Sequence, residues 1–552
     1  MMDDQLDQYI KYLKQERYSK CYKNEGKIIV ELQVNSQKVV LKCNVDPPFP
    51  YEFPKIYFVK EHSDKIRNIP HVIYDNSLCL FDTGKAEPNF LAPNQLLLES
   101  IQKAEKIISD GANGNNRDDF IKEFSAYWMS SNGRIANSFI TDDIKKKKLV
   151  WSLNEKHNPQ IIISESSEKL RYLSKVSWLQ DPPKINNITL YVSLDGSKIK
   201  VIPKKDIQVI RMVMESAYHP ERYQNFMQKN LGKTKLIIMK IYMENGTITV
   251  GWIHYPAFCN RGFRKGKDNI EVAYANKYTK KGCPVYIQDC SQSRLFNRGS
   301  DGQAVMWNRV AIFGCGSVGS SVAELMMRLG TTDFLLIDNE QLTIENIARH
   351  YCGYSFVGWS KTKSIQFKLT SHNPNIRCQC LNDDIHNILE KKDTRLNDYD
   401  LIVVAVANLS VENHIIEYIN SGIIHSPTTI ILWMEPYGIG GHALVINKQQ
   451  NLYDDLFSES DLRFQYGIVK NPELYLKREA GCESSYMPYS GFMVSMFVHS
   501  IFEYLKSEKL SSMQNFLITW IGKISKASTY GITITKEYEQ NNDYNIIRRR
   551  VD

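Results

Sequence analysis

Two cysteines and a glycine-rich turn are the residues of this chain that could carry out covalent chemistry. Cys79 lies in the stretch "SLCLFDTG", and Cys482 lies far downstream in the polar stretch "REAGCESSYMPYSGF". Because a thiolate can hold an acyl group as a thioester, two accessible thiols predict that an acyl group passes from one to the other. The sequence "GCGSVG" then places Gly314, Gly316 and Gly319 in the pattern G-x-G-x-x-G. Such a turn brings backbone N–H groups to nucleotide phosphates at a helix N-terminus.

The surroundings of Cys482 favour a reactive thiol. Gly481 precedes it, and Pro488 and Gly491 follow it and open the apolar helix expected in "FMVSMFVHSIFEYL". A nearby helix N-terminus favours the thiolate over the thiol. An incidental loop cysteine is the alternative reading of the same pattern.

Three further residues indicate which nucleotide the glycine turn binds. Asp338 ends the strand that follows the turn, where a carboxylate can hold a ribose hydroxyl. Arg349 lies in "NIARH" and Lys361 in "GWSKTKS". Two cations beside a phosphate turn suit a triphosphate better than a dinucleotide, because its charge needs neutralising. The glycines alone fit a dehydrogenase equally well.

This combination of motifs resembles the ubiquitin-activating and ThiF/MoeB-type adenylating superfamily. The superfamily pattern is G-x-G-x-x-G, then Asp, then N-x-x-R-Q, then G-x-x-K, and here Asn346, Arg349 and Lys361 follow Asp338 in that order. His350 stands where the superfamily has Gln. The resemblance covers about residues 300–505 and implies ATP as the nucleotide and an acyl-adenylate as the product, with Cys482 as the thioester-forming cysteine.

The magnesium site is the point at which the chain departs from this superfamily. The superfamily has an Asp in a D-N pair after the next strand, but here "AVANLSVEN" places Ala407 there, followed by Asn408. The resemblance still implies Mg²⁺ together with ATP and assigns Asn408 to the binding site. No metal ligand is assigned, although Asp338 or Glu435 could help to hold the ion.

The stretch "IPHVIYDNSLCL" resembles the ubiquitin-conjugating-enzyme signature H-P-N-V-Y-x-N-G-x-I-C-L. The matching residues are Pro70, Val72, Cys79 and Leu80. The proline-rich "DPPFPYEFPKIYF" upstream and the helices downstream agree with that fold over about residues 1–125. The resemblance implies that Cys79 is the nucleophile that carries the thioester.

Two positions depart from the conjugating-enzyme signature. His71 occupies the place of the Asn that supports the oxyanion, and Ile69 replaces the usual His. His71 could donate a hydrogen bond or act as a base, or it could be a structural histidine. The tryptophan expected after the cysteine is missing, and Phe90 lies nearby.

An activating and a conjugating segment on one chain resemble the bacterial fusion proteins of CBASS antiphage systems. The resemblance implies that the acyl donor is the C-terminus of a cGAS/DncV-like nucleotidyltransferase, that the acceptor is an amine of a target protein, and that the chain forms a homodimer. Fusion makes the exchange between the two thiols intramolecular or intradimer, which raises its effective concentration.

Three segments are expected to position these residues. Residues 1–135 form a ubiquitin-conjugating-like α+β domain, with an N-terminal amphipathic helix, strands in "KIIVELQV" and "KVVLKCNV", and helices near 92–108 and 117–129. Residues 136–300 form a connecting α+β domain with hairpins at Asp-Gly and Asn-Gly. Residues 301–552 alternate strand and helix, which predicts a doubly wound, mainly parallel α/β adenylation domain.

Composition restricts the partners. The 552 residues are too many for one core, and a net charge of +8 is modest and spread out, which argues against nucleic acid as a partner. The chain has no apolar run long enough to span a bilayer and no secretory signal, so we expect a cytoplasmic protein without a membrane partner. Its 11 cysteines include no CxxC pair, which argues against a zinc site or a disulfide framework.

Four alternatives remain open at this stage. An activating–conjugating enzyme could act on a different ubiquitin-like modifier, and a sulfur-carrier activator would leave Cys79 without a task. A NAD-dependent oxidoreductase would leave Arg349 and Lys361 unexplained. An inactive interaction scaffold is compatible with Ala407 and His71.

Overall fold

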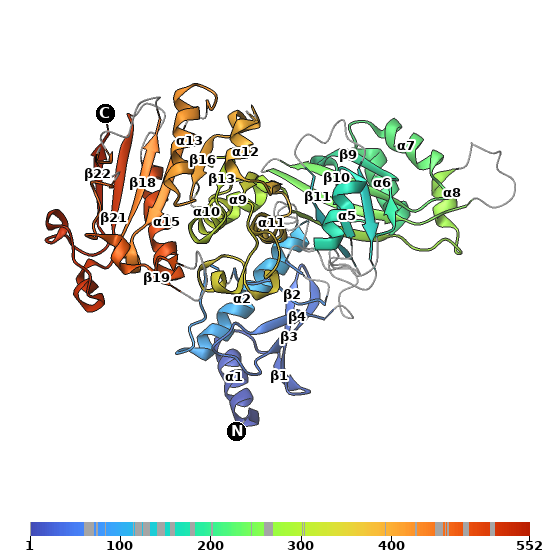
Figure 1. The fold of residues 1–552 in the computed structure, drawn as a ribbon. Helices are drawn as coiled ribbons and strands as arrows, with labels where there is room; N and C mark the ends of the chain where they lie inside the picture. Colours follow the sequence, from blue (N-terminus) through green and yellow to red (C-terminus); the bar gives the residue numbers. More distant parts are fainter. Residues whose placement is uncertain are drawn as a thin grey trace. The chain divides into compact units, whose positions relative to one another are not determined.

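The computed structural model describes residues 2–551 apart from several short segments. The segments outside the description are 60–70, 73–74, 83, 114, 116–123, 125–127, 129–132, 141–148, 155–160, 177–182, 200–201, 244–245, 259–268, 301, 303, 392–393, 426–427, 448–455, 459, 461–462, 479–484 and 508–513. The chain divides into two compact units, Met1–Ser291 and Gln292–Asp552 (Figure 1). Within the described residues, no helix has both the length and the apolar character needed to cross a bilayer.

The first unit begins with a four-stranded antiparallel meander in the order β1-β2-β3-β4, with one helix before it and one after it. Its elements are α1 (Met2–Glu16), β1 (Cys21–Asn24), β2 (Lys27–Val34), β3 (Gln37–Asn44), β4 (Lys55–Phe58) and α2 (Pro93–Asn113). Apolar faces of both helices, including Leu13 and Ile101, pack on strand residues such as Val30 and Leu41. The N-terminal helix, the two strands and the helix near 92–108 that were expected in this part are confirmed.

The helix α2 is longer than expected. The sequence "DGANGNN" predicts a break, yet the helix continues through Gly111 to Asn113. A single glycine costs a helix only about 1 kcal/mol, and the packing of Ile108 against the meander offsets that cost. The helix expected at 117–129 lies almost entirely outside the described residues.

The rest of the first unit is a mixed eight-stranded sheet in the order β8-β6-β7-β5-β12-β11-β10-β9. Its strands are β5 (Arg134–Ser138), β6 (Val150–Leu153), β7 (Ile161–Ser164), β8 (Ile185–Asn186), β9 (Thr189–Asp195), β10 (Lys235–Met243), β11 (Gly246–His254) and β12 (Cys283–Asp289). Its helices are α5 (Ser167–Val176), α6 (Asp206–Ser216), α7 (Pro220–Lys229) and α8 (Ile270–Ala275).

One of the two hairpins predicted in this sheet is confirmed. Met243 pairs with Gly246 in the antiparallel β10–β11 ladder, so these two strands form the hairpin expected around Asn-Gly. The Asp-Gly prediction is wrong, because β9 pairs in parallel with β10 and is followed by a 3₁₀ turn. Asp195 accepts a hydrogen bond from the N–H of Ser197 at 3.1 Å and thereby caps that turn.

The second unit contains an eight-stranded sheet in the order β15-β14-β13-β16-β17-β18-β21-β22. Its strands are β13 (Arg309–Phe313), β14 (Asp333–Ile337), β15 (Arg377–Leu381), β16 (Leu401–Val404), β17 (Thr429–Met434), β18 (Gly440–Ile446), β21 (Phe516–Ile521) and β22 (Ile546–Arg550). Its helices are α9 (Gln292–Gly299), α10 (Ser317–Arg328), α11 (Lys361–His372), α12 (Ile385–Glu390), α13 (Leu409–Asn420) and α15 (Gly491–Ser507). A short two-stranded ladder joins β19 (Lys477–Arg478) to β20 (Ser485–Tyr486).

The first five strands of this order are parallel, and the last three are antiparallel. Alternate residues of β13 enter different cores: Val310 and Ile312 pack with α10 and α15, whereas Ala311 and Phe313 pack with α13. Helices therefore cover both faces of the parallel strands, as predicted for a doubly wound domain. Because β14 and β15 lie on one side of β13 and β16 on the other, the switch point falls between β13 and β16.

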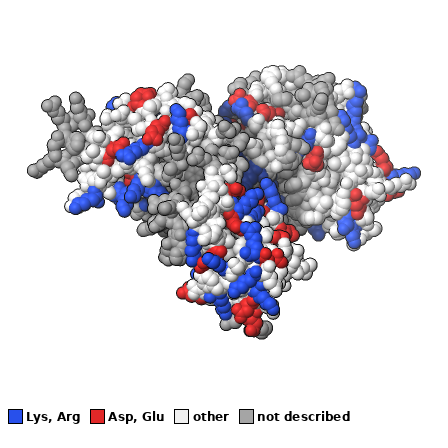
Figure 2. All heavy atoms as spheres, turned by 180° about the vertical axis from the view of Figure 1, so that it is seen from behind, with Lys and Arg blue, Asp and Glu red and all other residues white. Residues whose placement is uncertain are grey.

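The surface charge is mixed. Figure 2 shows one face of the molecule, on which acidic side chains accompany the basic ones over much of the area. Exposed ion pairs such as Arg17–Glu105, at 2.7 Å, are part of this pattern. The expectation that nucleic acid is not a partner stays a prediction.

Candidate active site

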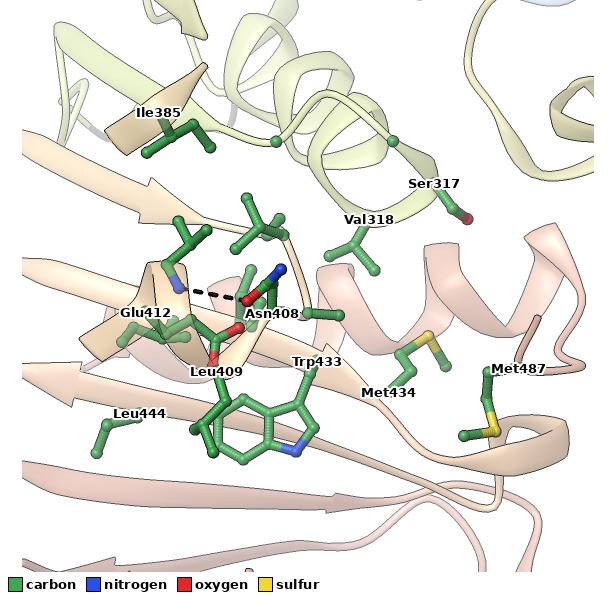
Figure 3. Close-up of a pocket in the computed structure, with 18 of the residues that line it drawn as sticks. Ser317, Val318, Ile385, Asn408, Leu409, Glu412, Trp433, Met434, Leu444 and Met487 are labelled. Carbon is green, nitrogen blue, oxygen red and sulfur yellow. Dashed lines mark hydrogen bonds between the residues drawn. The ribbon is translucent and has the colours of Figure 1, made fainter. Parts of the chain in front are cut away.

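A cavity of about 750 Å³ opens at the carboxyl ends of β13, β14, β16 and β17 (Figure 3). Its lining includes Gly314, Gly316, Asp338, Lys361 and Asn408. This is the switch point of the sheet, where doubly wound domains bind their ligands. The tertiary structure therefore brings together five of the residues that the sequence singled out.

The glycines of the turn have different physical roles. Gly314 has a φ of +82°, which a residue with a side chain rarely adopts. At Gly319, a Cβ atom would lie only 1.8 Å from the Gly314 carbonyl oxygen, so a methyl group does not fit there. A Cβ on Gly316 would meet no atom within 4 Å. The open space before the N-terminus of α10 fits the phosphate groups of a nucleotide.

Asp338 fixes the turn through its carboxylate. Its Oδ2 accepts the N–H of Cys315 at 2.7 Å, and its Oδ1 accepts the N–H of Glu340 at 2.8 Å. Burial raises the pKa of the carboxyl, and the two backbone N–H groups oppose that shift. Asp338 lines the cavity, so its remaining acceptor capacity is available to a ribose hydroxyl.

Lys361 is the first residue of α11, whose N-cap is Ser360. Its side chain is 7% exposed, and its Nζ forms an ion pair with the carboxylate of Glu340. Both residues line the cavity. The ion pair holds the Lys361 ammonium group at the wall of the cavity. Triphosphate oxygens bound there could replace the Glu340 carboxylate as its partner, because both are anionic oxygen acceptors.

Asn346 and Arg349 do not line the cavity within the described part of the chain. The side chain of Asn346 accepts hydrogen bonds from the N–H and the hydroxyl of Thr343, both at 3.2 Å. Arg349 donates to the carbonyl oxygen of Met487 at 3.0 Å, and its guanidinium lies 5.0 Å from the ring centroid of Tyr489. Met487 and Tyr489 themselves line the cavity, so Arg349 acts on it through these two residues.

The departure at Ala407 has a local consequence. Ala407 has a φ of +49°, a left-handed conformation in which Asn and Asp are enriched. Asn408 caps α13, since its Oδ1 accepts the N–H groups of Ser410 at 3.0 Å and Val411 at 3.3 Å. The second of these bonds is drawn in Figure 3.

The part of the chain that the structure describes offers no metal site built from its own side chains. Among the described residues, no cluster of three or more His, Cys, Asp and Glu side chains could hold an ion. Glu435 is excluded as a ligand because its oxygens accept His442 Nε2 at 2.6 Å and the backbone N–H groups of Ile468 and Val469. Of the two carboxylates considered from the sequence, only Asp338 lines the cavity.

His350, which stands where the superfamily has Gln, makes two hydrogen bonds to the backbone. Its Nδ1 accepts the N–H of Cys352 at 2.9 Å, so its Nε2 carries the proton and donates to the carbonyl oxygen of Cys315 at 2.8 Å. A side-chain amide also offers one acceptor and one donor. His350 thereby ties the phosphate turn to the segment after Arg349. Burial lowers its pKa, and Lys361 adds to that shift.

We expect the stability of the second unit to depend on pH through His350. Because its pKa is lower in the folded chain, the unfolded chain takes up the proton first as the pH falls below about 6.5. The free energy of unfolding should therefore decrease between pH 7.5 and 5.5, and less steeply in His350→Gln. Denaturant unfolding of both proteins across this range measures the difference, since other histidines contribute equally to each.

The control for this prediction is His350→Ala, which leaves the Cys315 carbonyl and the Cys352 N–H without partners. It should lose about 2 kcal/mol at pH 7.5, whereas His350→Gln should lose much less. Parallel pH profiles for the wild type and His350→Gln would show that the imidazole is not the group that titrates.

Cys79 is exposed, as a thioester carrier requires. It borders a hollow of about 290 Å³ whose lining includes Phe53, Tyr57, Asp75 and Phe81. The rings of Phe53 and Phe81 are stacked with centroids 4.0 Å apart. The thiol therefore lies at an open surface with apolar walls, where a peptide carbonyl can approach it.

A tight backbone arrangement holds this thiol. The N–H of Cys79 donates to the carbonyl oxygen of His71 at 2.8 Å, and Val72 forms an antiparallel bridge with Leu78. His71 and Asn76 have φ values of +67° and +65°. Left-handed residues other than glycine cluster at functional sites. The backbone of His71 thus positions Cys79, and the choice between donor, base and structural side chain stays open.

Cys482 lies outside the described residues, which exclude 479–484. The description resumes at Ser485, and Arg349 contacts Met487 in the segment that follows. The assignment of Cys482 as the first thioester carrier therefore stays a prediction. Phe90, the aromatic residue noted after Cys79, is 50% exposed and lies 5.4 Å from Tyr51 between ring centroids.

Sequence reasoning missed two features of the cavity. One is Glu412 in the first turn of α13, and the other is a group of large apolar side chains from β17, β18 and the segment after β18. An acidic residue early in a helix is usually an exposed partner of the helix dipole, so the sequence carries no sign that this one is buried.

Comparison with known families agrees with the two units. Residues 292–525 match the ThiF family, and residues 7–136 match Prokaryotic E2 family B. The chain therefore joins a ThiF domain to a prokaryotic E2 domain on one polypeptide. This pairing defines its class, an activating-type and a conjugating-type enzyme in one chain, and it confirms the resemblance that the motifs indicated.

Two relatives that align with most of this chain carry the same name, Cap2. The ATP-dependent ubiquitin transferase-like protein Cap2 of Pseudomonas aeruginosa (strain BWHPSA011 / Pa011) is 19% identical over 472 residues, which are 83% of this chain and 82% of that protein. The Cap2 protein of Escherichia coli (strain TW11681) is 20% identical over 499 residues, 82% of each chain.

Other matches cover less of the chain. Ubiquitin-like modifier-activating enzyme 5 of Dictyostelium discoideum is 28% identical over 223 residues, 38% of this chain and 55% of that protein. Among solved structures, E. coli MccB with ATP is 14% identical with a TM-score of 0.30, covering 47% of this chain and 66% of that one.

Proposed function

We propose that this protein activates the C-terminus of a protein with ATP in the cytoplasm and ligates it to an amine of a target protein. One observation carries the proposal: an exposed Cys79 in a prokaryotic E2 domain shares a polypeptide with a ThiF domain whose cavity has a phosphate turn. Each domain needs the other for the complete reaction. A conjugating thiol needs an activated acyl group, and an adenylating site supplies one.

Activation takes place in the cavity of the second unit. The backbone N–H groups near Gly316 and the Lys361 ammonium bind the phosphates, and Asp338 binds the ribose. A carboxylate oxygen of the substrate tail attacks the α-phosphorus, and pyrophosphate leaves. Mg²⁺ bound with the nucleotide would neutralise phosphate charge, and Asp338 is the carboxylate considered for it that lines the cavity; among the described residues, no cluster of three or more His, Cys, Asp and Glu side chains could hold the ion.

Two thiols then carry the acyl group in turn. The Cys482 thiolate attacks the acyl carbon and AMP leaves, forming the first thioester. The Cys79 thiolate attacks that thioester and releases Cys482. An amine attacks the Cys79 thioester, the thiolate leaves, and the amine loses a proton to a base, for which His71 is the candidate.

The substrate that we propose is the C-terminus of a cGAS/DncV-like nucleotidyltransferase, within antiphage defence. This rests on similarity to Cap2 proteins across most of both chains. The alternative within the same class is a different ubiquitin-like modifier. We also propose a homodimer formed by the ThiF domains, which light scattering of the purified protein tests.

Two measurements test the proposed function. ATP–pyrophosphate exchange that depends on a co-encoded nucleotidyltransferase shows activation, and it should disappear when the last residue of that protein is removed. A conjugate on non-reducing gels that is lost with a reducing agent shows the thioester. Nicotinamide binding without exchange would indicate an oxidoreductase, and the absence of both exchange and adduct would indicate a scaffold.

A further inference from the structure

The cavity continues on the side of the glycine turn away from Asp338 and Lys361. In the strand order, β14 and β15 lie on one side of β13, whereas β16, β17 and β18 lie on the other. Asp338 follows β14 and Ile385 follows β15, but Trp433 belongs to β17 and Leu444 to β18. A nucleotide anchored at Asp338 and Lys361 therefore leaves the β17–β18 side for a second ligand.

The lining on that side is a set of apolar side chains that we call the aromatic arm. It consists of Trp433, Leu444, Leu456, Phe457 and Phe464. The ring centroids of Trp433 and Phe464 are 5.1 Å apart at 85°, and Phe457 forms an antiparallel bridge with Phe464. These contacts preform an apolar surface, which favours an apolar ligand because binding removes that surface from water.

Glu412 is the acidic residue of the lining that lies on the helix after β16, on the same side as the arm. Its Oε1 is buried and has no hydrogen-bond partner among the described residues. Figure 3 shows Glu412, Leu409 and Trp433 pointing into the cavity, with Ser317 of the turn beyond Asn408. Burial raises the pKa of Glu412 to about 7, opposed by the backbone amide of Asn408.

A buried acceptor without a donor costs free energy, so most such groups find a partner when the site is complete. The nucleotide phosphates offer no donor to it. A polypeptide tail offers a backbone N–H at every residue except proline. The position of Glu412 beside the aromatic arm therefore matches a tail that is apolar in its side chains and polar in its backbone.

We propose that the aromatic arm binds the apolar residues that precede the activated carboxylate and that Glu412 accepts a backbone N–H of this tail. The inference rests on the proposed function and narrows its substrate to polypeptides with an apolar C-terminal segment. Glu412 would then be a specificity-determining residue, since a site built to accept an N–H rejects a ligand that lacks it. Acidic tails would be rejected by the carboxylate.

The test uses the full-length protein and short synthetic peptides that end in Leu-Phe-Ala-Gly or Glu-Glu-Ala-Gly. A third series replaces one amide near the end of the apolar peptide by an ester, which removes a single N–H. In ATP–pyrophosphate exchange, the KM of the apolar peptide should be about tenfold lower than that of the acidic peptide, and one ester should raise it about tenfold. Because the peptide comparison uses only the wild-type protein, it remains informative even if a variant fails to fold.

Variants of Glu412 identify the acceptor. Glu412→Leu should raise the KM of the apolar peptide about tenfold and abolish the difference between amide and ester, whereas Glu412→Gln keeps an acceptor oxygen and should change it less. The matched control is Glu417→Leu, on the exposed face of the same helix. The affinity for a non-hydrolysable ATP analogue, measured by calorimetry, should stay unchanged in all three.

Two results would overturn the inference while leaving activation intact: equal KM values for all peptides, or a loss of analogue affinity in Glu412→Leu as large as the change in KM. The second result would assign the carboxyl to the nucleotide or its metal. If the analogue binds but neither peptides nor a co-encoded protein support exchange, the proposed activation fails, and the tail site fails with it.

Discussion

Replacing Cys79 by alanine is expected to abolish ligation while ATP–pyrophosphate exchange continues at the wild-type rate. Loss of a nucleophile that forms a covalent intermediate reduces turnover by roughly 10³-fold or more. Activation should survive because it occurs in the second unit, which does not contain Cys79. Conjugates on reducing gels measure ligation, and labelled pyrophosphate measures activation.

Two variants test the order in which Cys482 and Cys79 receive the acyl group. Cys79→Ser should trap an oxyester that resists reducing agents, because oxygen replaces sulfur in the acyl link. Cys482→Ala should allow exchange but leave Cys79 unloaded. Cys290→Ala, a half-buried thiol of the first unit, serves as the control and should behave as wild type. Undiminished ligation by Cys79→Ala would remove the E2 domain from the reaction path.

Alanine at the second and third glycines of the turn should have opposite effects on folding and binding. Gly316→Ala should fold normally, because its Cβ meets no atom within 4 Å and its φ is −76°. The methyl group would project into the space where the backbone approaches the phosphates, so affinity for an ATP analogue should fall roughly 100-fold. Calorimetric titration measures this loss.

Gly319→Ala should instead lose stability, because its methyl group would lie 1.8 Å from the Gly314 carbonyl oxygen. Moving that backbone should cost about 3 kcal/mol, visible as a lower melting temperature of the second unit. Gly353→Ala is the control, since its Cβ also meets open space and Gly353 does not line the cavity. A stable Gly319→Ala with full affinity would contradict the assigned geometry of the turn.

The cavity brings together residues that the sequence assigns to one site. Gly314, Gly316, Asp338 and Lys361 were predicted as nucleotide-binding residues, and the structure brings all four to one cavity. Their spacing follows local rules, since a turn between a buried strand and a helix specifies its own glycines. The exposure of Cys79 agrees with the expectation of an accessible thiol.

Other residues of the motif act differently from what their spacing suggested. Asn346 caps a short helical turn through Thr343, and Arg349 contacts Met487. The Asp195–Gly196 step was expected to close a hairpin, but β9 found a parallel partner in β10. For Arg349 and β9, a long-range contact decided the outcome among locally allowed conformations, whereas Asn346 is held by a residue only three positions away.

The amino-acid sequence by itself determined the class of the protein, the order of its two enzymatic parts and the glycine turn, and it predicts Cys79 as a thiol that carries the acyl group. These are set by residue types at short spacing, where sterics and backbone hydrogen bonding leave few choices. Only the tertiary structure decided that the Oε1 atom of Glu412 is buried, that both oxygens of Glu435 accept hydrogen bonds and that aromatic side chains of β17 and the segment after β18 share one cavity. Burial and missing partners are properties of residues that meet only when distant segments pack together, and no short stretch of sequence encodes them.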